Sequence, residues 1–165
     1  MPVDETENPQ SVERRHQPRT SFEPYTEKAR RALFYARFEA SQLGASCIET
    51  EHLLLGLLRE GNAHLHLFVE PVSALEYIRM QIERHIQRGN DIPTSVDLSF
   101  SEECGRTLQY GTEEARSLHR DLIGPEHLLM GILREEHSFA ARMLRERGAD
   151  IEEIRMKFTE LSATI

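Results

Sequence analysis

Residues 51–60 read EHLLLGLLRE, and the same pattern returns 75 positions later as EHLLMGILRE at residues 126–135. When the comparison is extended outward, residues 26–60 and 101–135 are identical at 16 of 35 positions. A match of this length at one fixed spacing indicates an internal duplication. We therefore predict a domain made of two copies of one unit of about 65 residues.

Each copy opens with a segment in which apolar or small residues recur at helical spacing. The steps between them are about four, three, four and three, which places one stripe along a helix of about 17 residues. Thr26 and Ser101 stand just before these segments, each followed by Glu, and their hydroxyls can cap a helix N-terminus. The stripe consists of Ala29, Leu33, Ala36, Ala40 and Leu43 in the first copy and of Cys104, Leu108, Gly111, Ala115 and Leu118 in the second.

A second helix is expected to open at Thr50–Glu51 in the first copy and at Pro125–Glu126 in the second, since proline is tolerated in the first helical turn. Gly56 and Gly131 fall in the middle of this helix, where glycine costs about 1 kcal/mol relative to alanine. Because both copies bear that cost, we expect another helix to pass too close to each glycine for a side chain to fit.

Two further helices complete each copy. A short one is expected around His64 to Val69 in the first copy and Ser138 to Glu146 in the second. No segment shows the sustained alternation of a strand. The predicted fold is all-α, with eight helices arranged as two four-helix repeats related by a pseudo-two-fold axis. The last helix carries Leu75, Ile78 and Ile82 in the first copy and Ile151, Ile154, Phe158 and Leu161 in the second.

The predicted domain organisation has a tail and one duplicated domain. Residues 1–22 are expected to form a disordered tail, because they are polar and proline-containing with only scattered apolar side chains. The domain then spans residues 23–165, with repeat one at 25–88, a linker at 89–99 and repeat two at 100–162.

The composition of the 165-residue chain limits its partners and its compartment. A formal net charge of -8 argues against binding to a nucleic-acid backbone. No apolar run reaches the roughly 18 residues of a membrane span, so we expect a soluble, cytoplasmic protein without a nucleic-acid or membrane partner. Cys47 and Cys104 lack CxxC spacing, which fits a reducing compartment and core positions.

The motifs of the common catalytic and nucleotide-binding sites are missing from the sequence. It contains no GxxxxGK[ST] loop, no GxGxxG motif and no GxSxG elbow. His52 and His127 each follow a glutamate, but no second histidine stands four residues on, as the zinc-protease motif HExxH requires. We expect these two histidines to bond a first helical turn or a neighbouring loop. The sequence predicts a noncatalytic protein without a metal or a cofactor.

The starts of the helices offer one candidate recognition site in each copy. The free N–H groups at the helix starts behind Thr26 and Ser101 favour an anion. If the start of the second helix of the same copy packs nearby, Glu51 or Glu126 adds a carboxylate. A ligand with a phosphate and a guanidinium would match such a pair. Ordinary helix caps and first-turn acids explain the same residue types equally well.

Four segments of the sequence resemble a known family: YTEKARRAL and FSEECGRTL at the helix starts, and IETEHLLLGLLREG and IGPEHLLMGILREE in the middle of each copy. Together they look like the N-terminal domain of Clp ATPases of the ClpA/ClpC type, over about residues 22–162. The resemblance implies an all-helical domain that docks substrates and adaptors onto an unfoldase ring. The ATPase modules of that family are not found within these 165 residues.

The resemblance also implies ligand-binding residues. In ClpC-type domains a phosphoarginine site uses a Thr at the first helix and the Glu of the TEH motif, which correspond here to Thr26 with Glu51 and to Ser101 with Glu126. The sequence departs from the family pattern at Glu49, which adds a negative charge where a phosphate would approach, at Pro125, which removes an N–H, and in having Ser101 for Thr.

The resulting hypothesis is a noncatalytic protein-binding module of the Clp system, which recognises Clp ATPase or peptidase subunits, adaptor proteins or protein substrates. The alternative is a sensor of small ligands or stress signals that binds phosphoarginine or an apolar compound. Residues 65–77 also depart from the family's usual sequence, and there Leu65, Leu67 and Phe68 either face a changed partner or pack in the core.

Overall fold

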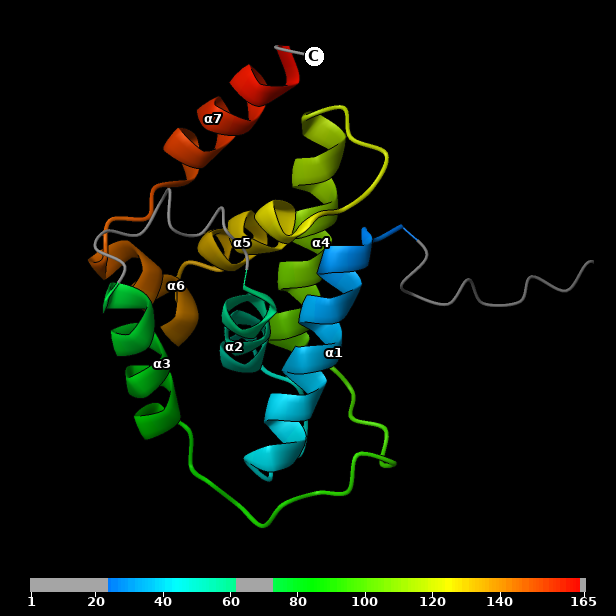
Figure 1. Cartoon of the computed structure of the whole chain (residues 1–165), viewed down its shortest axis with the longest axis vertical. Helices are drawn as coiled ribbons and strands as arrows, with labels where there is room; N and C mark the ends of the chain where they lie inside the picture. Colours follow the sequence, from blue (N-terminus) through cyan, green and yellow to red (C-terminus); the bar gives the residue numbers. More distant parts are fainter. Residues whose placement is uncertain (1–23, 62–72, 164–165) are drawn as a thin grey trace, which may run out of the picture.

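The computed structural model describes residues 24–61 and 73–163 of the chain (Figure 1). Within these residues the fold is all-α, as predicted, and contains no strand. The described residues hold seven helices instead of the eight expected. The missing one, predicted around His64 to Val69, lies outside the described residues, as do the predicted tail and the Leu65, Leu67 and Phe68 stripe. The helices are α1 (Glu27–Gln42), α2 (Thr50–Glu60), α3 (Ser73–His85), α4 (Glu102–Ser117), α5 (Pro125–Arg134), α6 (Phe139–Glu146) and α7 (Ile151–Ala163).

Helices α1 and α4 begin and pack as the sequence predicts. The Thr26 hydroxyl accepts a hydrogen bond from the Ala29 N–H at 3.1 Å, and the Ser101 hydroxyl accepts one from the Cys104 N–H at 3.1 Å. Each cap satisfies one of the N–H groups that a helix start leaves without a partner. The predicted stripes face the core, with Leu43, Leu108 and Leu118 partly buried and the other positions buried.

Helices α2 and α5 cross α1 and α4 at the two predicted glycines. A Cβ added at Gly56 would lie 2.2 Å from the Ala32 carbonyl oxygen, and one added at Gly131 would lie 2.3 Å from the Thr107 carbonyl oxygen. These contacts are with backbone, which has no rotamer to move aside. Backbone therefore rests on backbone at each crossing, and this confirms the close approach expected from the sequence.

The close crossings bury the leucine-rich faces of α2 and α5 almost completely. The side chains before and after each glycine pack in the core. Isoleucines from the last helix of each repeat belong to the same core. The fully buried large side chains are Ile48, Leu53, Leu54, Leu55, Leu57, Ile78, Ile82, Leu128, Leu129, Met130 and Ile132.

The two histidines close the first turns of α2 and α5. The Glu49 N–H donates to Nδ1 of His52 at 2.9 Å, and the Gly124 N–H donates to Nδ1 of His127 at 2.8 Å. Both imidazoles are buried, and burial lowers the pKa of each of them. The predicted structural role of these histidines is confirmed, because a neutral imidazole with a free Nδ1 is what accepts the backbone hydrogen.

Two isolated parallel bridges join the repeats. Tyr25, before α1, pairs with Ile123, before α5, and Ile48, before α2, pairs with Phe100, before α4. At the offset of 75, Tyr25 corresponds to Phe100 and Ile48 corresponds to Ile123, so each bridge contains one counterpart of a residue in the other bridge. The two contacts therefore interchange when the two copies are exchanged.

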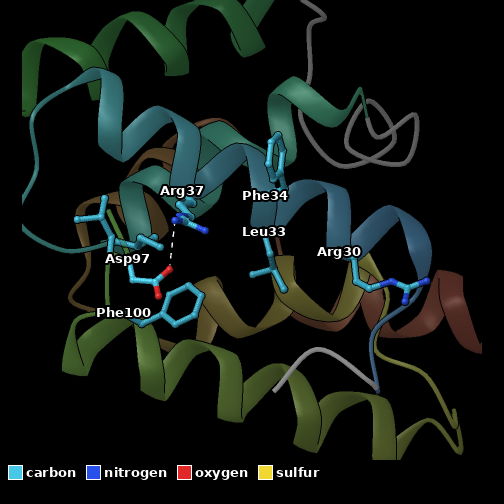
Figure 2. A pocket seen from close by; sticks show the side chains of 8 residues that line it. Arg30, Leu33, Phe34, Arg37, Asp97 and Phe100 are labelled. Carbon is cyan, nitrogen blue, oxygen red and sulfur yellow. Dashed lines mark ion pairs between the residues drawn. The ribbon is translucent and has the colours of Figure 1, made fainter. Parts of the chain in front are cut away.

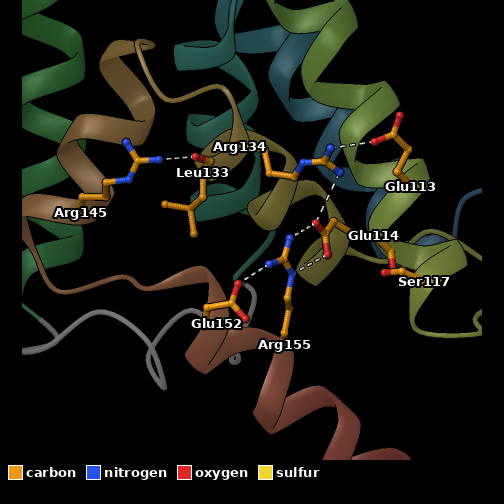
Figure 3. A network of polar contacts seen from close by, with 8 residues as sticks. All are labelled: Glu113, Glu114, Ser117, Leu133, Arg134, Arg145, Glu152 and Arg155. Carbon is orange, nitrogen blue, oxygen red and sulfur yellow. Dashed lines mark hydrogen bonds and ion pairs between the residues drawn. The ribbon is translucent and has the colours of Figure 1, made fainter.

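Each repeat also contains a buried glutamate that ties its helices together. Glu39 on α1 lies 3.3 Å from guanidinium nitrogens of Arg59 and Arg79, and Glu114 on α4 pairs with Arg134 and Arg155 (Figure 3). Only 7% of Glu39 and 2% of Glu114 is exposed, so the arginines supply the charge and the donors that a buried carboxylate needs. In this way the first, second and last helix of each repeat share one ionic contact.

Replacement of the crossing glycines by alanine tests the packing. Although alanine favours a helix, Gly56→Ala and Gly131→Ala should each lower the free energy of unfolding by about 2–3 kcal/mol, because the added methyl group forces the helices apart. Urea unfolding followed by circular dichroism measures the change. Gly105, on the exposed side of α4 with nothing near its Cβ position, is the matched control. Gly105→Ala should raise the free energy of unfolding by about 0.5–1 kcal/mol; equal effects at all three sites would contradict the close crossing.

The buried histidines predict a loss of stability in mild acid. In the unfolded chain the two histidines become protonated as the pH falls below about 6.5. In the folded protein their pKa values are lower, so they stay neutral to a lower pH and the unfolded state binds more protons. The free energy of unfolding should therefore be highest above pH 6.5. It should fall by about 1 kcal/mol per histidine between pH 7.5 and pH 5.5.

A non-titrating variant isolates this effect from that of other groups. In His52→Gln/His127→Gln the amides can still accept the capping hydrogen bond. The difference in unfolding free energy between wild type and this variant, measured in urea at both pH values, should shrink or invert on acidification. A difference that stays constant would show that the histidines do not titrate on unfolding.

Candidate functional site

The segment that leads to the predicted site residue Glu51 lies beside Ser101, from the other repeat. The Ser101 N–H donates to the Ile48 carbonyl at 3.0 Å, which fixes the start of α4 next to the start of α2. The Thr50 hydroxyl then contacts both helix starts, at 2.6 Å from Oε1 of Glu103 and 3.1 Å from Oε2 of Glu51. We call this group the α2/α4 start.

The start of α1, at Thr26, and the segment before Glu126 are joined in the same way. The Thr26 N–H donates to the Ile123 carbonyl at 3.0 Å, and the Ile123 N–H donates to the Pro24 carbonyl at 2.8 Å. Glu126 follows three residues later, and its carboxylate folds back to within 2.5 Å of where a Cβ on Gly124 would lie. We call this group the α1/α5 start.

These contacts correct the pairing expected from the sequence. Thr26 was paired there with Glu51, and Ser101 with Glu126, each within one copy. The hydrogen bonds instead join Thr26 to the segment of Glu126, and Ser101 to the segment of Glu51. The physical reason is the pair of bridges, each of which holds the start of a first helix against the start of the second helix of the other repeat.

The two helix starts differ strongly in charge. At the α2/α4 start, carboxylate oxygens of Glu49, Glu51 and Glu103 all lie within 4.8 Å of one another. Burial raises the pKa of Glu51, and the charges on Glu103 and Glu49 raise it further, against the hydrogen bonds that the carboxylate accepts. His85 is close to this group, with Nε2 3.7 Å from Oε1 of Glu51.

This acidic group disfavours a phosphate. The three carboxylates could each offer one oxygen to a hard cation. Within the described residues, they are the cluster of potential metal ligands whose donor atoms lie close enough together to bind one ion. Exposed acidic groups of this kind are common without an ion. Their effect on an approaching anion is repulsion.

At the α1/α5 start two of the three corresponding positions carry no carboxylate. Gly124 replaces Glu49, and Lys28 replaces Glu103, when the copies are compared at their offset of 75. One carboxylate remains in this group, that of Glu126 in the first turn of α5, and Thr26 caps the start of α1. This is the helix start whose charges suit a ligand with both an anionic and a cationic group.

A separate apolar groove runs along α1, with a cavity of about 360 Å³ (Figure 2). Its walls come from one face of α1 and from the chain segment before α4. Phe34 is 64% exposed, and Arg37 at the rim forms an ion pair with Asp97 at 3.2 Å. The lining residues are Arg30, Leu33, Phe34, Arg37, Ile48, Asp97, Leu98 and Phe100.

The sequence did not identify the residues of this groove. Phe34 lies off the apolar stripe of α1, at a position where the second copy has Gln109. An aromatic residue on the polar side of a helix, in one copy alone, is the signal that could have identified it. Phe100 and Leu98 belong to the segment that was predicted to be the end of the linker and the start of repeat two, and only the tertiary structure brings them to α1.

The cysteines are free thiols with different surroundings. Cys104 is buried in the core, as predicted, and burial raises the pKa of its thiol. Cys47 is partly exposed, its Sγ donates to Oε1 of Glu49 at 3.2 Å, and burial together with that carboxylate raises the pKa of its thiol. A raised pKa leaves little thiolate at neutral pH, which fits structural cysteines.

Among the helices of the described residues, none combines the length and the apolarity needed to cross a membrane.

Comparison with known proteins agrees with the sequence repeat and the fold. Residues 24–147 and 99–164 match the family described as the Clp repeat (R) N-terminal domain. The chain is 40% identical over 138 residues to the chloroplastic chaperone protein ClpC2 of Oryza sativa subsp. japonica, and 40% identical over 139 residues to the chloroplastic chaperone protein ClpC of Pisum sativum. These matches cover 83% and 84% of the chain but 15% of each relative.

Solved structures show the same fold. The N-terminal domain of the caseinolytic protease associated chaperone ClpD from Arabidopsis thaliana has a TM-score of 0.64 and 24% sequence identity, and the match covers 90% of this chain and 99% of that domain. Since the family match spans both copies of the duplicated unit, the chain belongs to the Clp repeat (R) N-terminal domain family.

Proposed function

We propose that the chain is a noncatalytic protein-binding module of the Clp system, which recognises Clp ATPase or peptidase subunits, adaptors or substrates. The observation that carries this proposal is the groove along α1. Exposed aromatic residues beside an apolar cavity are typical of binding surfaces, and Phe34 at 64% exposure stands beside Leu33, Leu98 and Phe100. Arg30, which also lines the groove, can add specificity through hydrogen bonds to a partner.

The groove predicts which substitution abolishes binding. Phe34→Asp should reduce the amount of Clp ATPase, peptidase or adaptor retained on the immobilised protein by roughly fivefold or more, since a central aromatic contact is lost. Purified components from the source cell, quantified after washing, provide the measurement. Met156→Asp is the matched control, because Met156 is 63% exposed on α7, away from the groove. Retention of no Clp component by the wild-type chain would refute the proposed function.

A second candidate function is a sensor of phosphoarginine. It is favoured by the α1/α5 start, where a capped helix N-terminus and Lys28 could face a phosphate and Glu126 could face a guanidinium. The α2/α4 start would reject the same ligand, because Glu49 and Glu103 add two carboxylates around Glu51. An apolar compound in the groove along α1 is the other form of this candidate.

Calorimetric titration with phosphoarginine separates the two helix starts. Glu126→Ala should weaken binding about tenfold or more, because the guanidinium loses its carboxylate partner. Glu51→Ala should leave the dissociation constant unchanged, and it serves as the matched control. The reverse order of effects would assign the ligand to the α2/α4 start, and no binding by the wild-type chain would remove this candidate.

We also propose how the two repeats are related, because this relation determines the geometry of the two helix starts. In that relation repeat one (25–88) and repeat two (100–162) are connected by the linker at 89–99 and exchange about a pseudo-two-fold axis. The interchanging bridges and the matching glycines, histidines and glutamates support it. A cytoplasmic location remains a prediction from the sequence, and the relatives named above are chloroplastic.

A further inference from the structure

One wall of the groove along α1 comes from the segment that links the two repeats. Asp97 and Leu98 line the cavity from this segment, and Phe100 follows them. Phe100 is held separately, through its bridge to Ile48. We call residues 89–98 the strap; it runs from the region after α3 toward α4, and Figure 1 shows it passing below α1. The groove has its apolar wall at Leu98 only while the strap lies against α1.

Main-chain hydrogen bonds hold the first half of the strap at the C-terminal end of α1. The Gly89 N–H donates to the Leu43 carbonyl at 2.8 Å, and the Ile92 N–H donates to the Ser41 carbonyl at 2.9 Å. The last carbonyl groups of a helix have no partner within the helix itself. The strap therefore supplies donors to this helix end.

One side chain of α1 holds the second half of the strap. The Arg37 guanidinium donates to the carbonyls of Thr94 and Val96, each at 3.0 Å, and it forms an ion pair with Asp97 at 3.2 Å (Figure 2). The Asp97 side chain is fully exposed, so solvent screens this ion pair. The two hydrogen bonds from a charged donor to main-chain carbonyls contribute most to this contact.

The strap buries little apolar surface of its own. From residue 89 to residue 97 every position is exposed except Ile92, which is half-buried. A segment that is held by hydrogen bonds without buried apolar contacts opens locally at a lower free energy than the packed helices. Docking of the strap therefore depends on a few anchoring residues of α1.

Gly44 is the anchor at the end of α1. It has a φ of +67°, and a Cβ there would overlap the Gly89 carbonyl carbon and the Asn90 carbonyl oxygen. Only glycine lets the backbone of the strap come this close. Gly44 lies ten residues after Phe34, which is about 15 Å at the helical rise, and it does not line the groove.

Both anchors differ between the two copies. At the offset of 75, Arg37 corresponds to Thr112, whose hydroxyl donates to the Leu108 carbonyl of its own helix at 3.1 Å. Gly44 corresponds to His119, which has a Cβ at this point although its φ is +55°. Neither replacement can hold a main-chain segment as repeat one does. The two anchors thus belong to the copy whose first helix lines the groove.

We propose that Gly44 and Arg37 are positioning residues of the groove, which act through the strap. Loss of either anchor releases the strap from α1, so the groove loses its wall at Leu98 while Phe34 stays in place. This inference rests on the proposed protein-binding function, because it concerns how the same groove is kept ready to bind. The link between the repeats thereby becomes part of the binding site.

The test measures how tightly the full chain binds anilinonaphthalene sulfonate, a dye with an apolar ring system. Its anionic group suits the exposed Arg30 in the groove. Phe34→Asp should weaken dye binding about fivefold or more, which locates the dye in the groove. Gly44→Ala should weaken dye binding by a similar factor, because the added methyl group displaces the strap.

Gly148→Ala is the matched control. Gly148, between α6 and α7, has a φ of +93°, and no atom of the described residues lies within 4 Å of where its Cβ would be. Alanine is strained at both glycines, but it meets the strap only at Gly44. Gly148→Ala should therefore lose stability and still bind the dye as tightly as wild type.

Gly89→Ala changes the same contact from the side of the strap. A Cβ on Gly89 would lie 2.8 Å from the Gly44 carbonyl oxygen. Gly89 is exposed and lies outside the helices, so this variant should fold even if Gly44→Ala does not. Its dye binding should be weakened as in Gly44→Ala.

Amide hydrogen exchange reports release of the strap directly. In both glycine variants the Ile92 amide should exchange about tenfold or more faster than in wild type. The amides at the centres of α2 and α5 should keep their wild-type rates. A role in stability alone would speed exchange in those helices as well.

A double variant separates positioning from direct contact at Arg37, which also lines the groove. If Arg37 acts through the strap, Gly44→Ala/Arg37→Ala should bind the dye no more weakly than the weaker single variant, because the strap is already released. Effects that multiply would assign Arg37 a direct contact with the dye and remove it from the proposal.

The inference is overturned if the Ile92 amide is released without loss of dye affinity, or if it stays protected in both glycine variants. Equal weakening of dye binding by Gly148→Ala also overturns it, as does a dye that does not bind wild type in a Phe34-dependent way. If these measurements fail while Phe34-dependent capture of Clp components succeeds, the inference falls and the proposed function stands. If the strap controls dye binding but wild type retains no Clp component, the proposed function alone falls.

Discussion

The structure depends on two places where helix backbone rests directly on helix backbone. At Gly56 and Gly131 the second helix of each repeat lies so close to the first that a methyl group would meet a carbonyl oxygen at 2.2–2.3 Å. Such an approach lets leucines before and after each glycine reach the core on both sides of the crossing, and many of them are completely buried. The burial of these apolar side chains, at about 25 cal/mol per Å², outweighs the cost of a glycine inside a helix.

The crossings fix the geometry within each repeat, while the two bridges fix the repeats to each other. Since Ile48 pairs with Phe100 and Tyr25 pairs with Ile123, every helix start that carries a candidate ligand contact belongs to both copies. A substitution in one repeat therefore changes a site whose other half lies in the other repeat. This explains how one helix start can be acidic and the other mixed in charge, although the backbone of the two is the same.

Much of the fold could be predicted from the sequence, because local patterns determine it. The caps at Thr26 and Ser101, the apolar stripes and the role of the mid-helix glycines each depend on a few neighbouring residues or on a comparison between copies. The pairing of helix starts could not be predicted in this way. Each start of a first helix packs against the start of a second helix from the other repeat, and this long-range contact leaves no local pattern in the sequence. Glu39 and Glu114 are identical in the two copies, yet nothing in a helical pattern shows that a glutamate at that position is buried against arginines from two other helices.

The comparison of the two copies separates structural from functional residues by a physical criterion. Gly56 with Gly131, His52 with His127 and Glu39 with Glu114 occupy corresponding buried positions and make corresponding contacts, so both repeats need them to fold. Several differences between the copies fall where the side chain meets solvent or another segment: Phe34 against Gln109, Glu103 against Lys28, and Gly44 against His119. Some buried positions differ as well, such as Ala29 against Cys104 and Leu55 against Met130. An exposed position is constrained only by what it contacts, and so differences between the copies at the surface are where separate binding properties can arise on one scaffold.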